Sequence, residues 1–396
     1  METINQAGIG TAQFDELLKK IHKAGEEVIR PNAADVDAKA RFPKEGMDEI
    51  KKLKLMGAYI PEELGGLGMN ISQVAKLCET LGQYCGSTAM IFAMHQIQVA
   101  CALHNGLSSD HFRSYLKRVA DEQRLLASAT TEMGVGGDLR TSICAVEVDG
   151  ERFGLTKNAP VISYGSQADD LFVTALRASD SPSNDQVHVV LSREDYELEP
   201  TMSWDTMGFR GTCSEGFIVK SKGHVKQIIP TPFADILSHS MHPTAHILWG
   251  SLWLGIATDA VNMARTFVRD MMKKNPNAPQ TAALRLAEVH SILQQMREDV
   301  HGCALEYQKY LADGNTTALD SFSFSVKINN LKISCSTLII DIVSRSLMIC
   351  GIAGYRNDSK FSLSRHLRDA YGASLMVNND RIMNHNSTLL LMQRED

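Results

Sequence analysis

The spacing of apolar residues changes twice along this chain, and these changes constrain the fold more than any other feature. Up to about residue 124, apolar side chains recur at intervals of three and four, which indicates amphipathic helices. From Leu125, short runs of strand-forming residues alternate with polar turns, and from about Phe233 the helical spacing returns. We therefore expect an α+β, mainly α protein. It should have an N-terminal helical domain (1–124), a middle antiparallel β domain (125–232) and a C-terminal four-helix bundle (233–396).

Several elements can be predicted within these three parts. The segment from Asn70 to His104 contains no proline and predicts two buried helices that are broken near Gly86. Two alternating runs flank Asp149-Gly150, a pair typical of a two-residue β-hairpin turn. Apolar residues between 286 and 311, and again between 331 and 342, keep helical spacing over long stretches, which favours a helix bundle.

Composition narrows the class of protein. The chain has 396 residues, of which 44% are hydrophobic and 22% charged, as in a globular protein. Its net charge of -6 gives no basic footprint for nucleic acid or an anionic membrane. The eight cysteines form no Cys-x-x-Cys pair, so we predict neither a metal site nor a disulfide framework. No uninterrupted apolar run reaches the ~18 residues of a membrane span, and we expect a cytoplasmic protein.

Residues 125–138 combine an apolar run with a glycine-rich loop. The loop carries Gly134, Gly136 and Gly137, where a backbone without Cβ atoms can approach a ligand closely. Such a loop suits a flat cofactor that bears phosphate groups. An ordinary glycine-rich turn between two strands is the alternative, because short glycine patterns also arise by chance.

The loop sequence Ala-Thr-Thr-Glu-Met-Gly-Val-Gly-Gly-Asp resembles the Thr-Glu-Pro-Gly-x-Gly-Ser-Asp signature of the acyl-CoA dehydrogenase superfamily. Four further segments resemble the family in order and spacing: Ile60–Gly68, Trp204–Thr212, Cys350–Tyr355 and Arg365–Ala370. The resemblance covers nearly the whole chain. It implies a flavoprotein with FAD between the β domain and the last bundle, assembled as a homodimer or homotetramer.

The resemblance also implies which residues hold FAD. The matching positions are Ser128, Thr130, Thr131, Gly136 and Gly137 in the loop, Ser163 in a second strand segment, Gln280 across the subunit interface, Gly351, and Asn379. Amides and hydroxyls at such positions orient a flavin and leave the redox chemistry to it. Gly137 replaces the family's serine, which removes a hydroxyl that would reach phosphate. Strand-end capping is the alternative role for Thr131 and Ser163, and a helix stop for Gly351.

The expected catalytic base is missing. Members of the family remove the α proton of an acyl thioester with a glutamate, and the matching position here is Val377. A second position, used by some members, corresponds to Ala245. Neither side chain can accept a proton. The ordinary base is therefore absent from both places.

Four other residues are candidates for the proton acceptor. His246 is next to Ala245, His242 lies one turn earlier, and His95 lies on a helix that often walls the flavin in this family. An imidazole with a pKa near ~6.5 can serve as a base at neutral pH. Asp380 follows Val377 by three residues. Packing or surface placement is the alternative for each histidine, since the chain has 13 of them.

These features predict an FAD-dependent oxidoreductase that oxidises an acyl group held as a thioester on CoA or an acyl carrier protein. The hydride would pass to flavin N5, and the base would be non-standard. A flavin-dependent monooxygenase of the same fold, which uses reduced flavin and O2, is one alternative. A catalytically inactive subunit or interaction protein is another. The electron acceptor, either an electron-transfer flavoprotein or O2, stays open.

Overall fold

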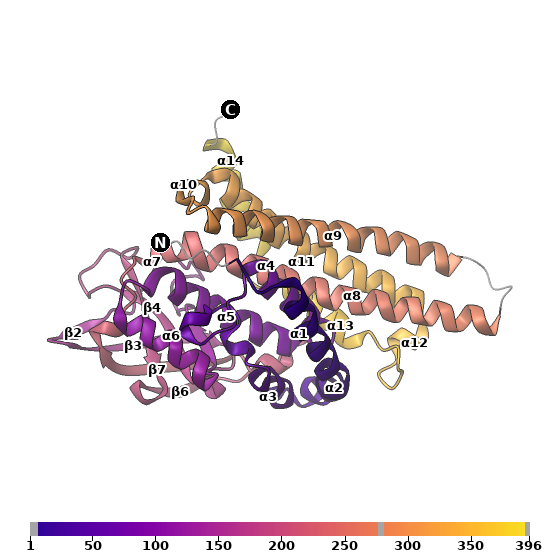
Figure 1. The fold of residues 1–396 in the computed structure, drawn as a ribbon, viewed down its shortest axis with the longest axis horizontal. Coiled ribbons are helices and arrows are strands. Elements are labelled where there is room, and N and C mark those ends of the chain that lie inside the picture. Colours follow the sequence, from indigo (N-terminus) through magenta and orange to yellow (C-terminus); the bar gives the residue numbers. More distant parts are fainter. Residues whose placement is uncertain (1–6, 276–280, 393–396) are drawn as a thin grey trace.

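The computed structural model describes residues 7–275 and 281–392, which run through helices, then strands, then helices again (Figure 1). This order confirms the expected fold class. The N-terminal helices and the strands pack into one body, and parts of α8, α9 and α11 project from it as an arm (Figure 1).

The N-terminal part is helical, as expected. Its helices are α1 (Thr11–Ala24), a π-helical segment η1 (Gly25–Ile29), α2 (Arg30–Lys39), α3 (Lys44–Lys52), α4 (Ile71–Gly82), α5 (Gly86–Gly106) and α6 (Asp110–Glu122). A capping box formed by Asn70 and Gln73 starts α4. Nearly every residue of α5 is buried, because this helix is apolar on all sides and lies in the core.

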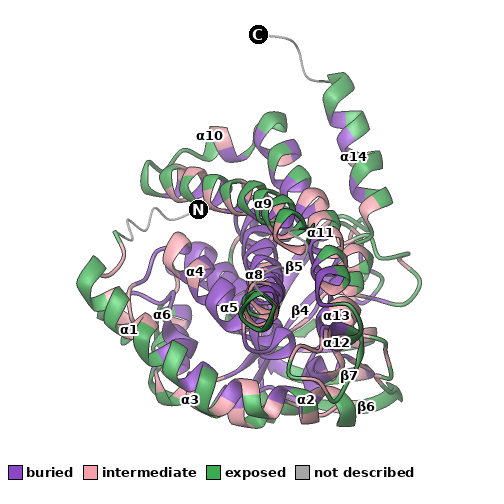
Figure 2. Ribbon diagram, turned by 90° about the vertical axis from the view of Figure 1, so that its right-hand side faces the viewer, coloured by how far each residue is buried: buried purple, intermediate pink, exposed green. Residues whose placement is uncertain are grey.

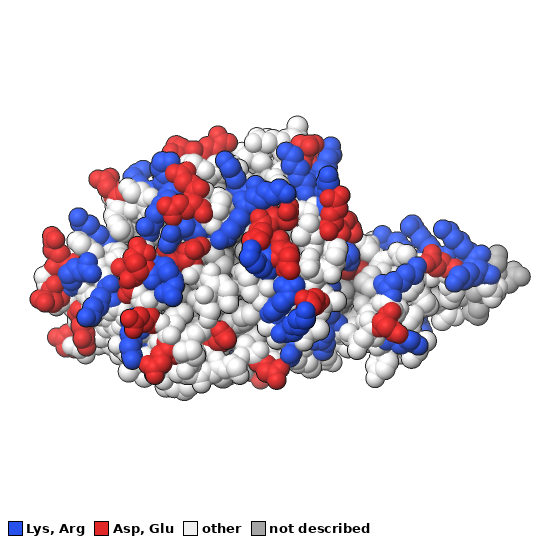
Figure 3. Space-filling model, turned by 90° about the horizontal axis from the view of Figure 1, so that it is seen from below, with Lys and Arg blue, Asp and Glu red and all other residues white. Residues whose placement is uncertain are grey.

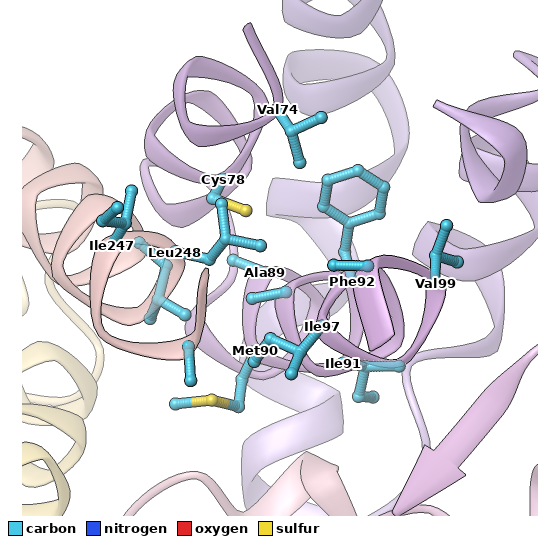
Figure 4. Packing of buried hydrophobic residues seen from close by; sticks show 14 of the residues in the cluster. Val74, Cys78, Ala89, Met90, Ile91, Phe92, Ile97, Val99, Ile247 and Leu248 are labelled. Atoms are coloured by element: carbon cyan, nitrogen blue, oxygen red, sulfur yellow. The ribbon is translucent and has the colours of Figure 1, made fainter. Parts of the chain in front are cut away.

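The core joins the first and last parts of the chain. Figure 4 shows Cys78 of α4, Met90 and Ile97 of α5, and Leu248 of α8 in one apolar cluster. Helix α8 packs against both α4 and α5. The N-terminal helices therefore hold α8 in place through apolar contacts.

The middle part contains two sheets. The strands are β1 (Leu126–Ala129), β2 (Glu147–Asp149), β3 (Arg152–Ile162), β4 (Asp170–Leu176), β5 (Gln186–Ser192), β6 (Tyr196–Met202) and β7 (Glu215–His224). Their order is β1-β4-β5 in one sheet and β2-β3-β7-β6 in the other. The predicted hairpin is present, since Asp149 pairs with Arg152.

Two features of the sheets differ from the sequence-based expectation. The domain is mainly antiparallel, but β1 and β4 are parallel, because the crossover between them carries a whole hairpin. Strand β6 was not predicted. It is an edge strand whose residues after Tyr196 are mostly exposed, and it contains Pro200, so it lacks the apolar alternation that identifies an inner strand.

The C-terminal part consists of α7 (Phe233–Ile236), a π-helical segment η8 (Leu237–Met241), α8 (His242–Lys274), α9 (Thr281–Ala312), α10 (Thr316–Leu319), α11 (Phe322–Cys350), α12 (Ile352–Tyr355), α13 (Ser364–Leu375) and α14 (Asn379–Met392). Helix α11 packs against α8, α9, α13 and α14. In Figure 2 buried residues line α8, whereas α14 stands out from the body and is largely exposed. Within the described residues, α11 is the one helix long and apolar enough to cross a membrane, and 44% of its apolar window is buried.

The Arg365–Ala370 motif ties the C-terminal helices to the rest of the chain. Nε2 of His366 lies 2.8 Å from the buried carboxylate of Asp259, which also forms an ion pair with Arg30 at 3.0 Å. The carboxylate of Asp369 accepts a hydrogen bond of 2.6 Å from the backbone N–H of Phe209. These buried contacts fix α13 against α8, the N-terminal helices and the β domain.

The surface agrees with the charge balance of the sequence. Figure 3 shows Lys and Arg side chains interspersed with Asp and Glu over one face of the body. Lys and Arg gather more densely toward the end of the projecting arm in this view. The face drawn in Figure 3 therefore carries no continuous basic stripe of the kind that binds nucleic acid.

Candidate functional site

The start of the glycine loop is fixed by a buried ion pair. The carboxylate of Glu132 accepts hydrogen bonds from the backbone N–H groups of Ile143 (3.2 Å) and Cys144 (2.6 Å). Nζ of Lys157 lies 3.5 Å from Glu132 and donates to the carbonyl of Thr174 at 2.6 Å. Burial lowers the pKa of Lys157. The glutamate of the loop motif therefore has a structural role.

Thr131 connects the glycine loop to strand β3. Its hydroxyl donates a 2.9 Å hydrogen bond to the carbonyl of Val161. Two residues further along, the hydroxyl of Ser163 lies 2.8 Å from that of Ser214. No described residue accepts a hydrogen bond from the backbone N–H of Thr131 or Ser163. The two segments meet and leave free amide donors, which fits the acceptor atoms along the edge of a flavin ring.

Two other predicted cofactor residues lie at the end of β1. Ser128 is half-buried, and its hydroxyl lies 3.5 Å from that of Thr130, a long contact. The carbonyl of Thr130 accepts from the hydroxyl of Thr174 at 3.3 Å. Thr130 is thus held by β4, and its hydroxyl stays available for a ligand.

Helix α14 holds the glycine loop from outside. The guanidinium of Arg381 donates hydrogen bonds to the carbonyls of Gly136 and Gly137. Gly136 and Gly137 have φ of +63° and +78°, left-handed conformations that favour glycine. Because C=O and N–H point opposite ways in a planar trans peptide, the N–H of Gly137 points away from Arg381. No described residue accepts from it, so it remains free for an anionic ligand.

His242 and His246 form a pair on one face of α8. Their rings are 4.4 Å apart and cross nearly edge to face. Nδ1 of His246 lies 3.0 Å from the carbonyl oxygen of Ile328, and Nε2 of His242 lies 2.8 Å from Oδ1 of Asn329. Burial lowers the pKa of His242 to about 4 and that of His246 well below its ordinary value. Both imidazoles are therefore neutral at neutral pH.

The hydrogen-bond partners define which ring nitrogens carry protons. A carbonyl oxygen only accepts, so His246 must be protonated on Nδ1 and must present a lone pair on Nε2. Oδ1 of Asn329 also only accepts, which places the proton of His242 on Nε2 and a lone pair on Nδ1. No described residue donates to either of these lone pairs. The pair thus presents two free proton-accepting nitrogens.

A chain of asparagines continues from His242. Nδ2 of Asn329 donates to Oδ1 of Asn386 at 2.7 Å, and Nδ2 of Asn386 donates to Oδ1 of Asn330 at 2.9 Å. Asn329 and Asn386 are buried, whereas Asn330 is exposed. The chain links α8, α11 and α14, and every bond in it runs in the same direction.

Val377 lies in the linker between α13 and α14. Its φ is +49°, which is strained for a β-branched side chain, and its side chain is partly exposed. The neighbouring Asn379 begins α14, and its Oδ1 accepts a 2.6 Å hydrogen bond from Nζ of Lys332. Nδ2 of Asn379 donates to the hydroxyl of Ser336 at 3.1 Å. The side chain of Asn379, a predicted cofactor contact, is therefore turned toward α11.

Lys332 is a buried lysine on α11. It forms no ion pair with a carboxylate of the described residues, and burial lowers its pKa to about 8. Its hydrogen bond to Asn379 holds the start of α14. Lys332 thus supports the linker that carries Val377.

The remaining predicted residues lie elsewhere or outside the described chain. Both ring nitrogens of His95 are engaged, since Nδ1 accepts from Leu126 N–H at 3.1 Å and Nε2 lies 2.8 Å from the carbonyl of Met56. Asp380 is exposed at the start of α14, and Gly351 ends α11 with φ of +55°. Gln280 lies outside the described residues. His95 therefore bridges core segments and has no free nitrogen.

Lys157, Lys332 and Arg381 were not singled out in the sequence. Lys157 occupies an inward position of the alternating strand β3, between the buried Leu155 and Ala159. Lys332 adjoins the apolar stripe of α11. A lysine at an inward position is a signal of a buried polar role, and it could have revealed the first two. Nothing in the sequence connects Arg381 with a loop that precedes it by more than two hundred residues.

The described residues contain no group of His, Cys, Asp or Glu side chains arranged to hold a metal ion. Two places combine predicted site residues with free donors or acceptors. One is the junction of the glycine loop with β3, and the other is the meeting of α8, α11 and α14. Helix α14 contacts both, because it carries Arg381 and Asn386. We take these two places as the halves of one candidate active site.

The order of the domains and the placement of the glycine loop define an acyl-CoA dehydrogenase fold. Residues 11–123 match the acyl-CoA dehydrogenase N-terminal domain family. Cyclohex-1-ene-1-carbonyl-CoA dehydrogenase of Geobacter metallireducens is 26% identical over 351 residues, which cover 86% of this chain and 88% of that protein. The chain thus carries the N-terminal domain of the acyl-CoA dehydrogenases and is similar to members of that superfamily over most of its length.

Solved structures agree with this assignment at the level of the fold. Butyryl-CoA dehydrogenase from Megasphaera elsdenii superposes with a TM-score of 0.82 at 20% identity, and the match covers 97% of this chain and 99% of that one. FMN-bound TdsC from Paenibacillus sp. A11-2 gives 0.83 at 20% identity, with 96% and 98% covered. TdsC is a dibenzothiophene monooxygenase. The fold is therefore shared by a dehydrogenase and a monooxygenase.

Proposed function

We propose that this protein is an FAD-dependent oxidoreductase that oxidises an acyl group held as a thioester, with His246 as the proton acceptor. The observation that carries this proposal is the free Nε2 lone pair of His246, one residue from the Ala245 position. The acyl group is carried by CoA or by an acyl carrier protein. Electrons leave to an electron-transfer flavoprotein or to O2.

Residues of the first half of the site would hold the cofactor. The backbone N–H groups of Thr131 and Ser163 are free to donate to a flavin ring, and the N–H of Gly137 is free to donate to phosphate. When bound, FAD supplies the hydride acceptor at N5. The ion pair of Lys157 with Glu132 keeps the loop in the conformation that presents these donors.

The two histidines have lowered pKa values and are neutral at neutral pH, as a base that replaces the missing carboxylate must be. Burial lowers the pKa of His242 to about 4, and burial and the nearby His242 lower the pKa of His246 well below its ordinary value. An unperturbed glutamate has a pKa of about 4.3. His242 is therefore no stronger as a base than the glutamate that the resemblance leads us to expect. At neutral pH both imidazoles are present in the proton-accepting form.

Assembly as a homodimer or homotetramer is part of the proposal. Several apolar side chains of the C-terminal helices are exposed: Met348, Ile352, Tyr355, Leu375 and Leu391. A groove of about 340 Å³ between α9 and α11 is lined by Arg285, Glu288, Asp341, Ser344, Arg345 and Met348. The exposed apolar side chains named above, rather than the mostly polar groove, favour contact with a second subunit. Gln280, just before α9, is the residue expected to reach the partner's cofactor.

Replacement of His246 tests the proposed base. His246→Ala should slow reduction of the bound flavin by an acyl thioester by ~100- to ~10,000-fold, the usual contribution of a positioned general base. His290→Ala is the matched control, because His290 is exposed on α9 and should change the rate little. An unchanged rate in His246→Ala, with full flavin content, would exclude His246 as the base.

A second-site variant makes this test stricter. In His246→Ala, the further change Val377→Glu places a carboxylate at the position used by other members of the family. If the chemistry is α-proton removal, the double variant should recover part of the lost rate. Failure of the double variant, combined with a fully active wild type, would point to a base elsewhere.

A flavin-dependent monooxygenase is the second candidate. The observation that favours it is the absence of a carboxylate at both Val377 and Ala245. Such an enzyme would not be reduced by a thioester in the absence of oxygen. It would instead form a hydroxylated product when supplied with reduced flavin and O2. An inactive scaffold would retain neither reaction.

A further inference from the structure

We propose that Asn329 and Asn386 are positioning residues that hold His242, whose ring centroid lies 4.4 Å from that of His246, in the Nε2–H tautomer with a lone pair on Nδ1. The proposal rests on the directed chain of hydrogen bonds from His242 through Asn329 and Asn386 to Asn330. Its consequence for the rate rests on the proposed function, but the tautomer itself does not.

The orientation of Asn329 decides the tautomer. In the present orientation its carbonyl oxygen faces His242 and its amide nitrogen faces Asn386. If the amide turned over, its N–H would face Nε2 of His242 and the imidazole proton would have to move to Nδ1. An isolated asparagine has little preference between these two orientations.

Asn386 removes this ambiguity. Its Oδ1 faces Asn329 and accepts, while its own Nδ2 is engaged by Oδ1 of Asn330. A turn of Asn329 would bring two acceptor oxygens together across 2.7 Å, and a buried amide would lose its bonds. Asn329 can therefore turn only if Asn386 turns with it, so Asn386 couples the two buried amides and opposes a turn of Asn329 alone.

The tautomer matters because the two histidine rings are only 4.4 Å apart. Charge on His242 lowers the pKa of His246, and in the proposal the lone pair of the neutral His242 offsets part of the cost of placing a proton on His246. An Nδ1–H in the same place would present a positive edge and oppose that protonation. Asn329 and Asn386 would thus act on the reaction through His242.

The groups that surround the pair support this assignment. Helix α11 contributes Lys332, and its charge acts on His246 and opposes the protonation of that ring. Arg140 and His385, from the loop after Gly137 and from α14, act in the same sense on His242. No carboxylate of the described residues contacts either histidine. The Nδ1 lone pair is therefore a stabilising element that these surroundings otherwise lack.

Two variants of Asn386 separate the tautomer from simple packing. In Asn386→Asp a carboxylate oxygen can still accept from Asn329, and the exposed Asn330 can bond water, so the direction of the chain is kept. In Asn386→Ala that acceptor is lost, and Asn329 is free to turn. The experiment uses the flavin-loaded protein labelled with 15N-histidine, and His242 is assigned by comparison with His242→Gln.

The 15N spectrum should place the His242 proton on Nε2 in wild type and in Asn386→Asp, and should show a mixture of tautomers in Asn386→Ala. Flavin reduction by a thioester should be roughly tenfold to a hundredfold slower in Asn386→Ala, by analogy with the loss of a hydrogen-bond partner behind a metal-ligating histidine. Asn386→Asp should restore it. Circular dichroism and flavin content verify that both variants are folded.

A proton on Nδ1 of His242 in wild type would overturn the proposal. Equal spectra for Asn386→Ala and wild type would do the same. If wild type has the expected tautomer but no thioester reduces its flavin, the proposed function fails and the assignment of Asn329 and Asn386 as positioning residues stands.

Discussion

Nδ1 of His246 lies 3.0 Å from the carbonyl oxygen of Ile328, so the imidazole donates its single proton to α11. Its other nitrogen faces away from that contact with a free lone pair. The adjacent residue is Ala245, the second position at which the resemblance leads us to expect a carboxylate. This free lone pair is the feature that the proposed role of His246 as proton acceptor requires.

The lowered pKa values predict how the rate depends on pH. His246 accepts a proton only when neutral, and burial moves its pKa well below the ordinary value. The neutral form is therefore lost only when the pH falls far below about 6.5. Anaerobic flavin reduction, followed by stopped flow, should be constant between about pH 6 and 8. A rate that falls with an apparent pKa near 6.5 would instead indicate an exposed histidine.

Thr131→Ala should weaken flavin retention without unfolding the protein. The hydroxyl of Thr131 holds the glycine loop against Val161 of β3. Loss of this hydrogen bond should destabilise the ordered loop by about 1 kcal/mol. Dilution or gel filtration should release flavin from the variant faster than from wild type. Thr131→Ser keeps the hydroxyl and serves as control. Equal retention in wild type and Thr131→Ala would contradict the assigned role.

Val377→Gly should stabilise the folded protein. Val377 has φ of +49°, and a β-branched residue in this region carries roughly 1 to 3 kcal/mol of strain. Glycine adopts this conformation freely, although its flexible unfolded state offsets about 1 kcal/mol. Urea unfolding should show a net gain of about 1 kcal/mol. Met376→Gly, at a residue with φ of -63°, should destabilise the protein and is the matched control.

Because the pKa of Lys332 is lowered, we expect the free energy of unfolding to depend on pH. Its pKa is about 8 in the folded protein, below the ordinary 10.5, so the unfolded chain binds more protons between these values. Wild type should therefore gain stability as the pH rises above about 8, by at most about 1.4 kcal/mol per pH unit. Below that pH both states are protonated and the contribution is constant.

Lys332→Met should lack this gain, so wild type and variant should converge or cross as the pH rises from about 8 to 10. The control is Lys273→Met, since Lys273 is exposed near the end of α8 and should leave the pH profile unchanged. Parallel profiles for wild type and Lys332→Met in urea unfolding would show that Lys332 titrates normally.

Most helices and strands could be predicted because an element that buries one face repeats its apolar residues at a regular spacing. Helix α5 begins at Gly86, where the break was expected, and the Asp149-Gly150 turn joins β2 to β3. Strand β6 has no such spacing of apolar residues, because an exposed edge strand buries little on either face. Its detection required the pairing partner β7.

The site was predictable only in part, for a physical reason. Thr131 and Ser163 could be proposed as cofactor contacts from motifs, since each motif is local in sequence. The direction of the hydrogen bonds around His242 depends on Asn329, which lies 87 residues further along the chain, and on Asn386, which lies further still. Polar networks between distant helices have no local pattern. The histidine pair could be named from the sequence, but its tautomers and neutral charge required the structure.

Oxidation of an acyl thioester by the bound flavin can be tested by adding acyl thioesters to the flavin-loaded wild-type protein without oxygen. A panel of CoA and carrier-protein thioesters should include one that bleaches the oxidised flavin absorbance, with an α,β-unsaturated thioester as product. We expect this bleaching in wild type and its loss in His246→Ala. No bleaching by any thioester, together with a hydroxylated product from reduced flavin and O2, would contradict it and establish a monooxygenase.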